Sequence, residues 1–159
     1  MDYAHIVHPA EGVQVVPDVT DQPKGVFTIE GEIGPLIFGE ISQTYYVEMP
    51  PYTYLDPHPH SFEALIYAVR GSFVVMADNV RTVVEPGGLM MFGANVATGY
   101  EVPFKEPAFM LVFRGGRPEL DQQAFMARLK EDEVPTLLDL ADDHPAIEFA
   151  RSVNPEFAT

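Results

Sequence analysis

The residues best suited to chemistry in this chain are His58 and His60, two histidines one residue apart at the start of an apolar segment that ends at Gly71. Side chains two positions apart on an extended segment share one side, so both imidazoles can converge on one point. Neutral imidazole binds Zn, Fe, Ni, Cu or Mn, and a nearby carboxylate would complete a set adequate for metal chemistry. A rigid, exposed loop is the alternative, because Pro57 and Pro59 flank the first histidine.

The same pair also suits acid-base chemistry without a metal. Histidine titrates near neutral pH, so either imidazole could move a proton in an isomerisation, a cyclisation or an elimination. Oxygenase chemistry would need a third protein ligand for the metal. The chain has no cysteine, which removes thiolate nucleophiles, disulfides and cysteine-based metal sites from consideration.

The elements that must position the histidines are short, β-rich segments between closely spaced turn residues. The breaks include Gly34-Pro35, Pro50-Pro51, Asp78-Asn79 and Pro86-Gly87-Gly88. Many short strands with such frequent turn signals predict an all-β sandwich or barrel over residues 26–114. The predicted strands cover residues 26–29, 36–38, 41–49, 64–69, 72–77, 80–84, 89–92 and 109–113.

The two ends of the chain differ from this barrel in composition and in the spacing of apolar residues. Residues 1–25 contain three prolines and one short apolar run, which predicts an extended arm with one strand-like piece. After Gly116, apolar residues recur at helical spacing in 120–129, and 134–141 and 146–153 each open next to a proline. We expect short helices within 117–153, packed on the outside of the barrel. No repeat or linker is evident, so residues 1–159 are interpreted as one domain.

Charge and hydropathy restrict the partners. The formal net charge is −15, and no local cluster of lysine or arginine offsets it. Such charge repels the phosphate backbone, so no nucleic-acid partner is expected. The first residues lack a basic stretch followed by an apolar core, and no apolar run has the length of a membrane span. The sequence therefore predicts a soluble, cytoplasmic protein with no membrane partner.

The outer side of the strand that follows His60 indicates contact with a second subunit. This side has more large apolar residues than a solvent-facing strand usually shows. The sequence therefore predicts a homodimer, to which the N-terminal arm could contribute by crossing to the partner. The residues on this side are Ser61, Glu63, Leu65, Tyr67 and Val69.

The stretch from about Gly39 to Gly116 resembles the cupins, a family of small double-stranded β-helix proteins. The first motif of that family has two histidines, a glutamate and a glycine, and His58, His60 and Gly71 fall on it. Gly87 can open the second motif. The C-terminal helices resemble those of quercetinase-like and polyketide-tailoring cupins. The resemblance implies a cupin-type jelly-roll barrel and one divalent metal ion, Fe, Zn, Ni or Mn.

The chain departs from both cupin motifs at ligand positions. Ala64 stands where the family has its ligand glutamate, and Glu63 is one residue early, which in a regular strand sends its side chain to the opposite face. Thr98 stands where the family has its last ligand histidine. Glu63 is the first candidate to complete a site with His58 and His60, if a bulge turns it inward. The remaining candidates are His5, His8, Asp56 and Glu101, and metal-free use is the alternative.

A regular strand after His60 would leave an apolar pocket. Phe62, Ala64 and Ile66 would face inward with the histidines, and Thr98 and Tyr100 would face them from the second motif. Such a pocket suits a small, largely apolar organic molecule, although the same residues could simply pack the core. Two functions remain open. One is an enzyme of the oxygenase, isomerase, cyclase or lyase type, with His58, His60 and Tyr100 as catalytic residues. The other is a non-catalytic, metal-free binding module.

Overall fold

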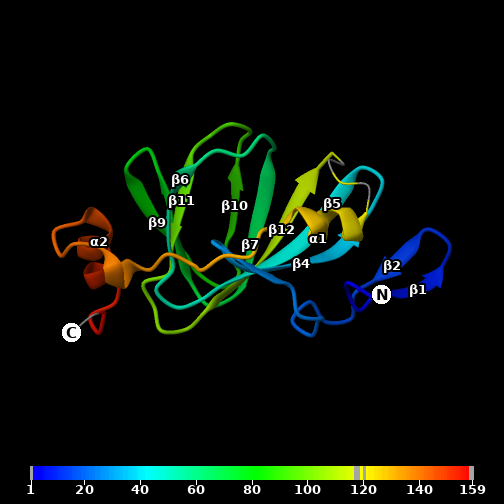
Figure 1. Ribbon diagram of the computed structural model, residues 1–159, viewed down its shortest axis with the longest axis horizontal. Coiled ribbons are helices and arrows are strands. Elements are labelled where there is room, and N and C mark those ends of the chain that lie inside the picture. The colour runs from blue at the N-terminus through cyan, green and yellow to red at the C-terminus, as the bar shows by residue number, and fades with distance from the viewer. Residues whose placement is uncertain (1, 117–118, 120, 158–159) are drawn as a thin grey trace.

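Two antiparallel sheets face each other in the computed structural model, which describes residues 2–116, 119 and 121–157 (Figure 1). The six-stranded sheet has the order β10-β7-β12-β5-β4-β3, and the four-stranded sheet has the order β6-β11-β8-β9. The strands of the first sheet are β3 (Val26–Thr28), β4 (Gly31–Phe38), β5 (Ser42–Met49), β7 (Ala64–Arg70), β10 (Leu89–Phe92) and β12 (Ala108–Gly115). Those of the second are β6 (Tyr54–His58), β8 (Phe73–Ala77), β9 (Val80–Val84) and β11 (Thr98–Glu101).

The alternation of side chains along the strands builds the core between the sheets. On β7, Ala64, Ile66 and Ala68 are buried, whereas Leu65 and Tyr67 between them are exposed. In the second half of β12, Val112 and Arg114 are buried and Phe113 is exposed, because a strand turns successive side chains to opposite faces. The predicted all-β fold is confirmed, and in the part of the chain that the structure describes, helices occur only after the last strand.

Turn residues connect the strands as the sequence indicates. Asp78 and Asn79 both have positive φ, 51° and 62°, as a two-residue hairpin turn between β8 and β9 requires. Gly71, between β7 and β8, has φ 69°, and a Cβ atom there would lie 2.0 Å from the backbone oxygen of Pro107. No other residue type fits this approach of two backbones.

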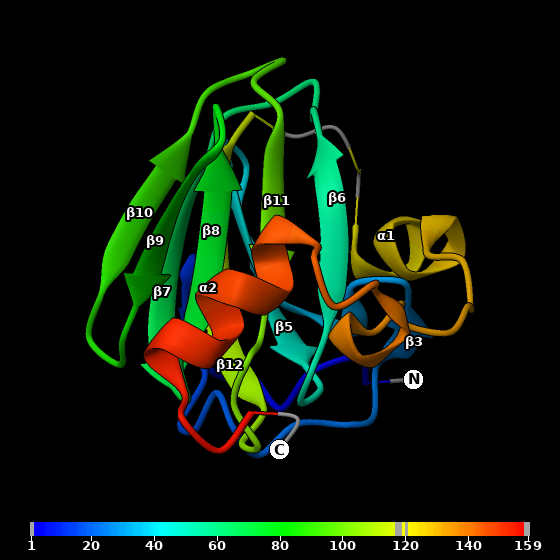
Figure 2. The same ribbon diagram turned by 90° about the vertical axis from the view of Figure 1, so that its left-hand side faces the viewer.

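The C-terminal segment wraps the sandwich from outside. Helix α1 (Gln122–Arg128) inserts Phe125 between the rings of Phe38 and Tyr45, at centroid distances of 5.3 and 5.0 Å. Figure 2 shows helix α2 (Pro145–Val153) across the outer face of the four-stranded sheet. A second apolar cluster joins Tyr54 of β6 to this region, with members Leu137, Ala146, Ile147, Ala150 and Phe157.

The helix predicted over 134–141 forms only as a short 3-10 turn, η1 (Leu137–Asp139). The residues before it are extended instead, because Thr136 bridges Thr53 and the carbonyl of Pro135 accepts from the Tyr54 N–H. The predicted helical run after Gly116 includes Arg117, Pro118 and Leu120, which lie outside the described residues.

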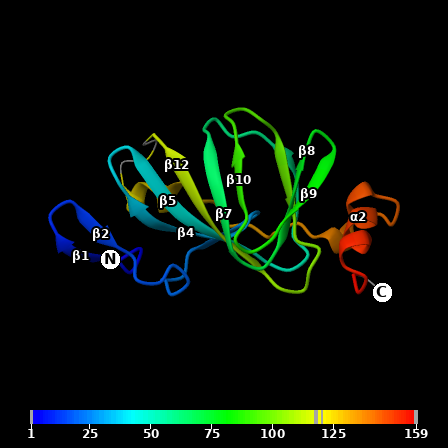
Figure 3. The ribbon, with the colours of Figure 1, turned by 180° about the vertical axis from the view of Figure 1, so that it is seen from behind.

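The N-terminal arm contains two strands where one was expected. Strands β1 (Val7–Ala10) and β2 (Val13–Val15) form a hairpin whose residues are all exposed. Figures 1 and 3 show this hairpin standing clear of the sandwich. The chain then returns to the barrel, where Val16 and Val19 pack against the outer side of the six-stranded sheet.

Within the described part of the chain, no helix combines the length and the apolar character needed to cross a membrane.

Candidate metal centre

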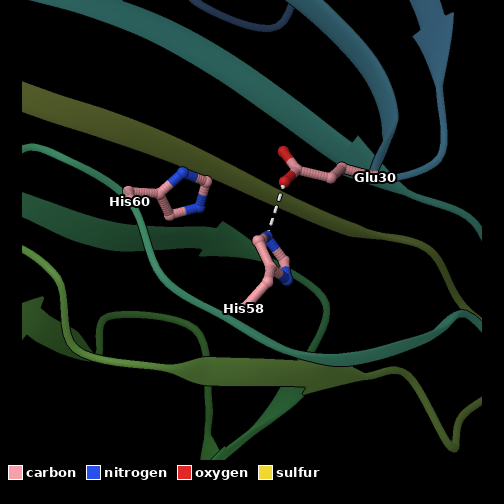
Figure 4. A group of neighbouring side chains, drawn as sticks. All are labelled: Glu30, His58 and His60. Carbon is pink, nitrogen blue, oxygen red and sulfur yellow. Dashed lines mark hydrogen bonds and ion pairs between the residues drawn. The ribbon is translucent and has the colours of Figure 1, made fainter.

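Three side chains from separate elements meet at one end of the sandwich: Glu30, His58 and His60 (Figure 4). Glu30 lies in the tight turn between β3 and β4, whereas His58 ends β6 on the facing sheet and His60 follows two residues later. One donor atom from each residue lies within 4.8 Å of the other two. The group therefore bridges the two sheets, and the structure brings the predicted histidine pair together.

His58 is held at both ring nitrogens. Its Nδ1 lies 2.9 Å from the carbonyl oxygen of Asp56, and its Nε2 lies 3.1 Å from Oε1 of Glu30. An Nδ1–H donating to the carbonyl directs Nε2 toward the site, which is how ligand histidines are commonly oriented. The hydrogen bond to Glu30 raises the pKa of His58, while partial burial acts in the opposite direction. A metal ion would take the place of the proton between these two atoms.

His60 has a different environment. Its ring centroid lies 4.8 Å from that of His58, and its ring packs against Phe62 and Phe92, each at 5.2 Å. Burial lowers the pKa of His60, although the nearby Glu30 carboxylate partly offsets this. A lowered pKa favours the neutral imidazole, which is the form that binds a metal ion.

A small apolar cavity opens directly from this group. Its polar lining consists of Glu30, His60, Tyr45 and Tyr100. The remaining walls are apolar side chains from strands of the six-stranded sheet, Ile66 among them. The volume open to water is about 30 Å³. Since one water needs roughly 10–15 Å³ on this measure, the cavity has room for an ion and a water rather than for an organic molecule.

Tyr100 and Thr98 form a buried polar pair next to the histidines. Their hydroxyl oxygens lie 3.0 Å apart, and Thr98 is paired with His58 across strands β11 and β6. Burial raises the pKa of Tyr100 to about 12, so this phenol keeps its proton at neutral pH. Burial also raises the pKa of Tyr45. The site thus contains two neutral phenols that can donate hydrogen bonds.

The other predicted pocket residues are distributed along the same end of the sandwich. Ala64 is fully buried in the core, and Phe62 is half-buried against His60. Glu63 is exposed and lines a depression on the outer side of the six-stranded sheet. Among the described residues, the structure therefore groups Glu30, and not Glu63, with the histidines. The reason is the regular alternation into β7, which turns Glu63 outward and Ala64 inward.

The remaining ligand candidates have other partners. Glu101 binds Nε of Arg81 at 3.1 Å, and the ring of His5 contacts the carbonyl of Asp21 in the N-terminal arm. Asp56 contributes through its backbone carbonyl to His58. Sequence reasoning missed Glu30 because this residue precedes His58 by 28 positions and belongs to no motif. Its signal in the sequence is a carboxylate directly before the turn residue Gly31.

The comparisons with known proteins agree with this architecture. The family model of the cupin domain matches residues 45–114. A solved RmlC-like cupin from Shewanella frigidimarina is 16% identical, with a TM-score of 0.54, over 61% of this chain and 86% of that chain. The polyketide cyclase RemF from Streptomyces resistomycificus is 20% identical, with a TM-score of 0.55, over 64% of this chain and 80% of that chain.

No curated protein matches the sequence. The two-sheet fold is consistent with the cupin jelly roll, and the cupin domain model, which matches residues 45–114, supports a cupin superfamily protein. Cupins often bind a metal ion, and here a carboxylate and two histidines form the group that could hold one.

Proposed function

We propose that this protein is a metal-dependent cupin enzyme that acts on a small, largely apolar organic molecule. The observation that carries the proposal is the convergence of Glu30, His58 and His60 within 4.8 Å at the end of an apolar cavity. Two imidazoles and one carboxylate are the ligand set that binds iron(II) with open positions, and the same donors suit Zn, Ni and Mn. In this proposal Glu30 replaces the carboxylate that the cupin motif would place at position 64.

The residues around the ion would do four things. The Asp56 carbonyl fixes the orientation of His58, and Phe62 and Phe92 fix that of His60. The apolar walls leave room for little more than one water beside the ion. The phenol of Tyr100, oriented by Thr98, donates a hydrogen bond to an oxygen atom in the cavity. The ion, when bound, supplies Lewis-acid chemistry that polarises such an oxygen.

This arrangement suits an oxygenase, an isomerase, a cyclase or a lyase. A cyclase gains some support from the structural likeness to RemF, which is itself a polyketide cyclase. At 20% identity this likeness concerns the fold, so the reaction type is left to substrate screening.

Metal content measured by mass spectrometry after dialysis against iron(II) or zinc(II) tests the proposal. Wild type should bind one ion per chain, and Glu30→Gln and His60→Ala should both lose it, because each removes one of three ligands. Glu63→Gln is the matched control, since it changes the neighbouring exposed carboxylate, and it should keep the ion. Equal metal content in wild type and Glu30→Gln would refute the site.

A metal-free binding module is the second candidate function. The ion pair between Glu30 and His58, at 3.1 Å, already satisfies both side chains, which favours a site that works without an ion. Wild-type protein that holds no metal after reconstitution but binds small apolar molecules without converting them would support this candidate over the enzyme.

We also propose that two copies associate. The exposed hairpin β1–β2 and the apolar outer side of β7 and β10 support this, because an isolated two-stranded hairpin is marginally stable in water.

A further inference from the structure

A buried cation lies near the metal centre and has no role in the function proposed above. Arg114 is the last inward-facing residue of β12, in the same row as Met110 and Val112, which line the metal cavity. Its side chain is only 2% exposed. A charged group so far out of water needs strong partners, because burying a charge is costly.

Aromatic rings connect this cation to the metal centre. The Cζ atom of Arg114 lies 4.4 Å from the ring centroid of Phe62 and 5.8 Å from that of Tyr45. Phe62 also packs on His60 at 5.2 Å, and Tyr45 lines the metal cavity. The guanidinium is therefore one aromatic side chain away from a proposed metal ligand.

The polar partners of Arg114 are a carboxylate and a side-chain amide. Its Nη2 forms an ion pair with the buried carboxylate of Glu119 and lies 3.5 Å from Oε1 of Gln43. The amide of Gln43 also donates to the backbone oxygen of Glu119 at 2.8 Å. Among the residues that the structure describes, Nε of Arg114 has no hydrogen-bond partner, although it is buried. The surroundings of Arg114 thus accommodate a carboxylate, and the Nε–H of the guanidinium group is left as an available donor.

We propose that Arg114 and Gln43 form the subsite for the carboxylate of the ligand, and that Glu119 fills this subsite in the ligand-free protein. The inference rests on the proposed function, because it names the substrate class of the same site. The class is a flat carboxylic acid, aromatic or similarly conjugated. Its ring takes a place beside Phe62, and its far end reaches the ion held by His60.

Charge and space both favour this exchange. The metal cavity of about 30 Å³ is far below the roughly 300–1,000 Å³ of ordinary ligand sites, whereas Arg114 and Gln43 line a separate depression of about 340 Å³. A ligand that enters from this depression reaches the guanidinium by displacing Glu119. The carboxylate of Glu119 also pairs with Nη2 of Arg128 at 2.7 Å. A carboxylic acid in its place would keep the charge pairing of Arg114 and would leave Arg128, which is 63% exposed, to the solvent. A guanidinium also binds a carboxylate through two parallel hydrogen bonds, which would use the free Nε donor.

The test compares 4-hydroxybenzoate with its neutral analogue 4-hydroxybenzamide by titration calorimetry. Metal-free protein in a chelator is used, so that the probe cannot bind an ion directly. Wild type should prefer the acid. Glu119→Gln should bind the acid about tenfold more tightly, because its charged competitor is gone, and the amide unchanged. Arg114→Met should lose the preference for the acid.

A matched control comes from the other buried arginine–glutamate pair, Arg81 with Glu101, in which the arginine is 11% exposed and the glutamate 2%. Arg81→Met should leave acid binding unchanged.

If Arg114→Met does not fold, the affinity of Glu119→Gln for the acid still tests the subsite. Acid and amide binding equally well in wild type and in Glu119→Gln would overturn the proposal. Metal content is measured separately. Wild type that binds the ion but shows no preference for the acid contradicts the subsite alone, whereas wild type that prefers the acid but binds no ion contradicts the proposed function alone.

Discussion

A single proton links Glu30 to His58 in the metal-free protein. The hydrogen bond to Glu30 raises the pKa of His58 in the folded state. The folded state therefore binds this proton more tightly than the unfolded chain does. Its contribution to stability is fully present below the ordinary pKa of histidine, about 6.5, and is lost as the pH rises through the raised value.

The expected result is a pH-dependent difference between wild type and Glu30→Gln in a chelator. As the pH rises from about 6, the wild-type advantage in free energy of unfolding should shrink, because His58 loses its proton in the folded state. Burial lowers the pKa of His60 in both proteins, whereas Glu30 raises the pKa of both histidines, so the difference between the two proteins reports the effect of the carboxylate on the pair. Urea denaturation at several pH values measures it. A difference that stays constant with pH would contradict the link.

The hydroxyls of Thr98 and Tyr100 give a second expectation at this scale. Tyr100→Phe leaves the buried Thr98 hydroxyl without its partner at 3.0 Å, which should lower the free energy of unfolding by about 1 kcal/mol. The double variant Thr98→Val, Tyr100→Phe should lose less than the sum of the single variants, because removing both partners leaves no unpaired group. Urea denaturation of the four proteins checks this, and strict additivity would contradict it.

The site residues differ in how far the sequence predicts them. The histidine pair is predictable because its spacing and the following strand belong to one local pattern. Glu30 is not, because the contact depends on how the turn after β3 meets the end of β6 on the facing sheet. The burial of Arg114 is not predictable either, because the sequence around an arginine in an apolar strand does not indicate the buried glutamate that pairs with it.

At the scale of elements, the segment before η1 ties together the two strands that lead to the metal ligands. The N–H of Asp132 donates to Phe27 of β3 at 3.0 Å, and the Tyr54 N–H of β6 donates to Pro135 at 2.9 Å. Strand β3 leads to Glu30, and β6 ends at His58. The segment therefore binds one strand of each sheet, next to the proposed site.

Leu137 anchors this segment and gives a matched pair of variants with its neighbour. Leu137 is 0% exposed and Leu138 is 57% exposed. Leu137→Ala should lower the free energy of unfolding by about 2–5 kcal/mol, through lost burial and the cavity left behind. Leu138→Ala should change it by less than about 0.5 kcal/mol. Similar values for the two variants in urea denaturation would show that the segment is not docked as described.

Strands were more predictable than helices for a physical reason. Strands β7 and β12 are short apolar segments bounded by turn residues, which a local window of the sequence contains in full. The helical interpretation of 134–141 failed because backbone pairing between Thr136 and Thr53 outweighs local helix propensity. That pairing joins residues far apart in the chain, so no local window contains it.

At the scale of the whole molecule, two surfaces remain without a partner in one chain. The hairpin β1–β2 exposes Val7, Val13 and Val15. The outer side of the six-stranded sheet exposes Leu65 and Met91, which line a depression of about 340 Å³. Exposed apolar patches of this kind mark interaction sites, and a second copy presents both surfaces in return. The homodimer predicted from the outer face of β7 follows the same reasoning.

Light scattering at micromolar concentration should give twice the 17.6 kDa of one chain. Met91→Lys, on the proposed interface, should shift the mass to that of one chain, because a charge there would be desolvated without a partner. Val80→Lys is the control, since Val80 is similarly exposed, at 64% against 57% for Met91, but lies on β9 of the other sheet. Deleting residues 1–15 should weaken association if the hairpin crosses to the second copy. A monomeric wild type contradicts the dimer, and dissociation by Val80→Lys but not by Met91→Lys would place the interface on the four-stranded sheet.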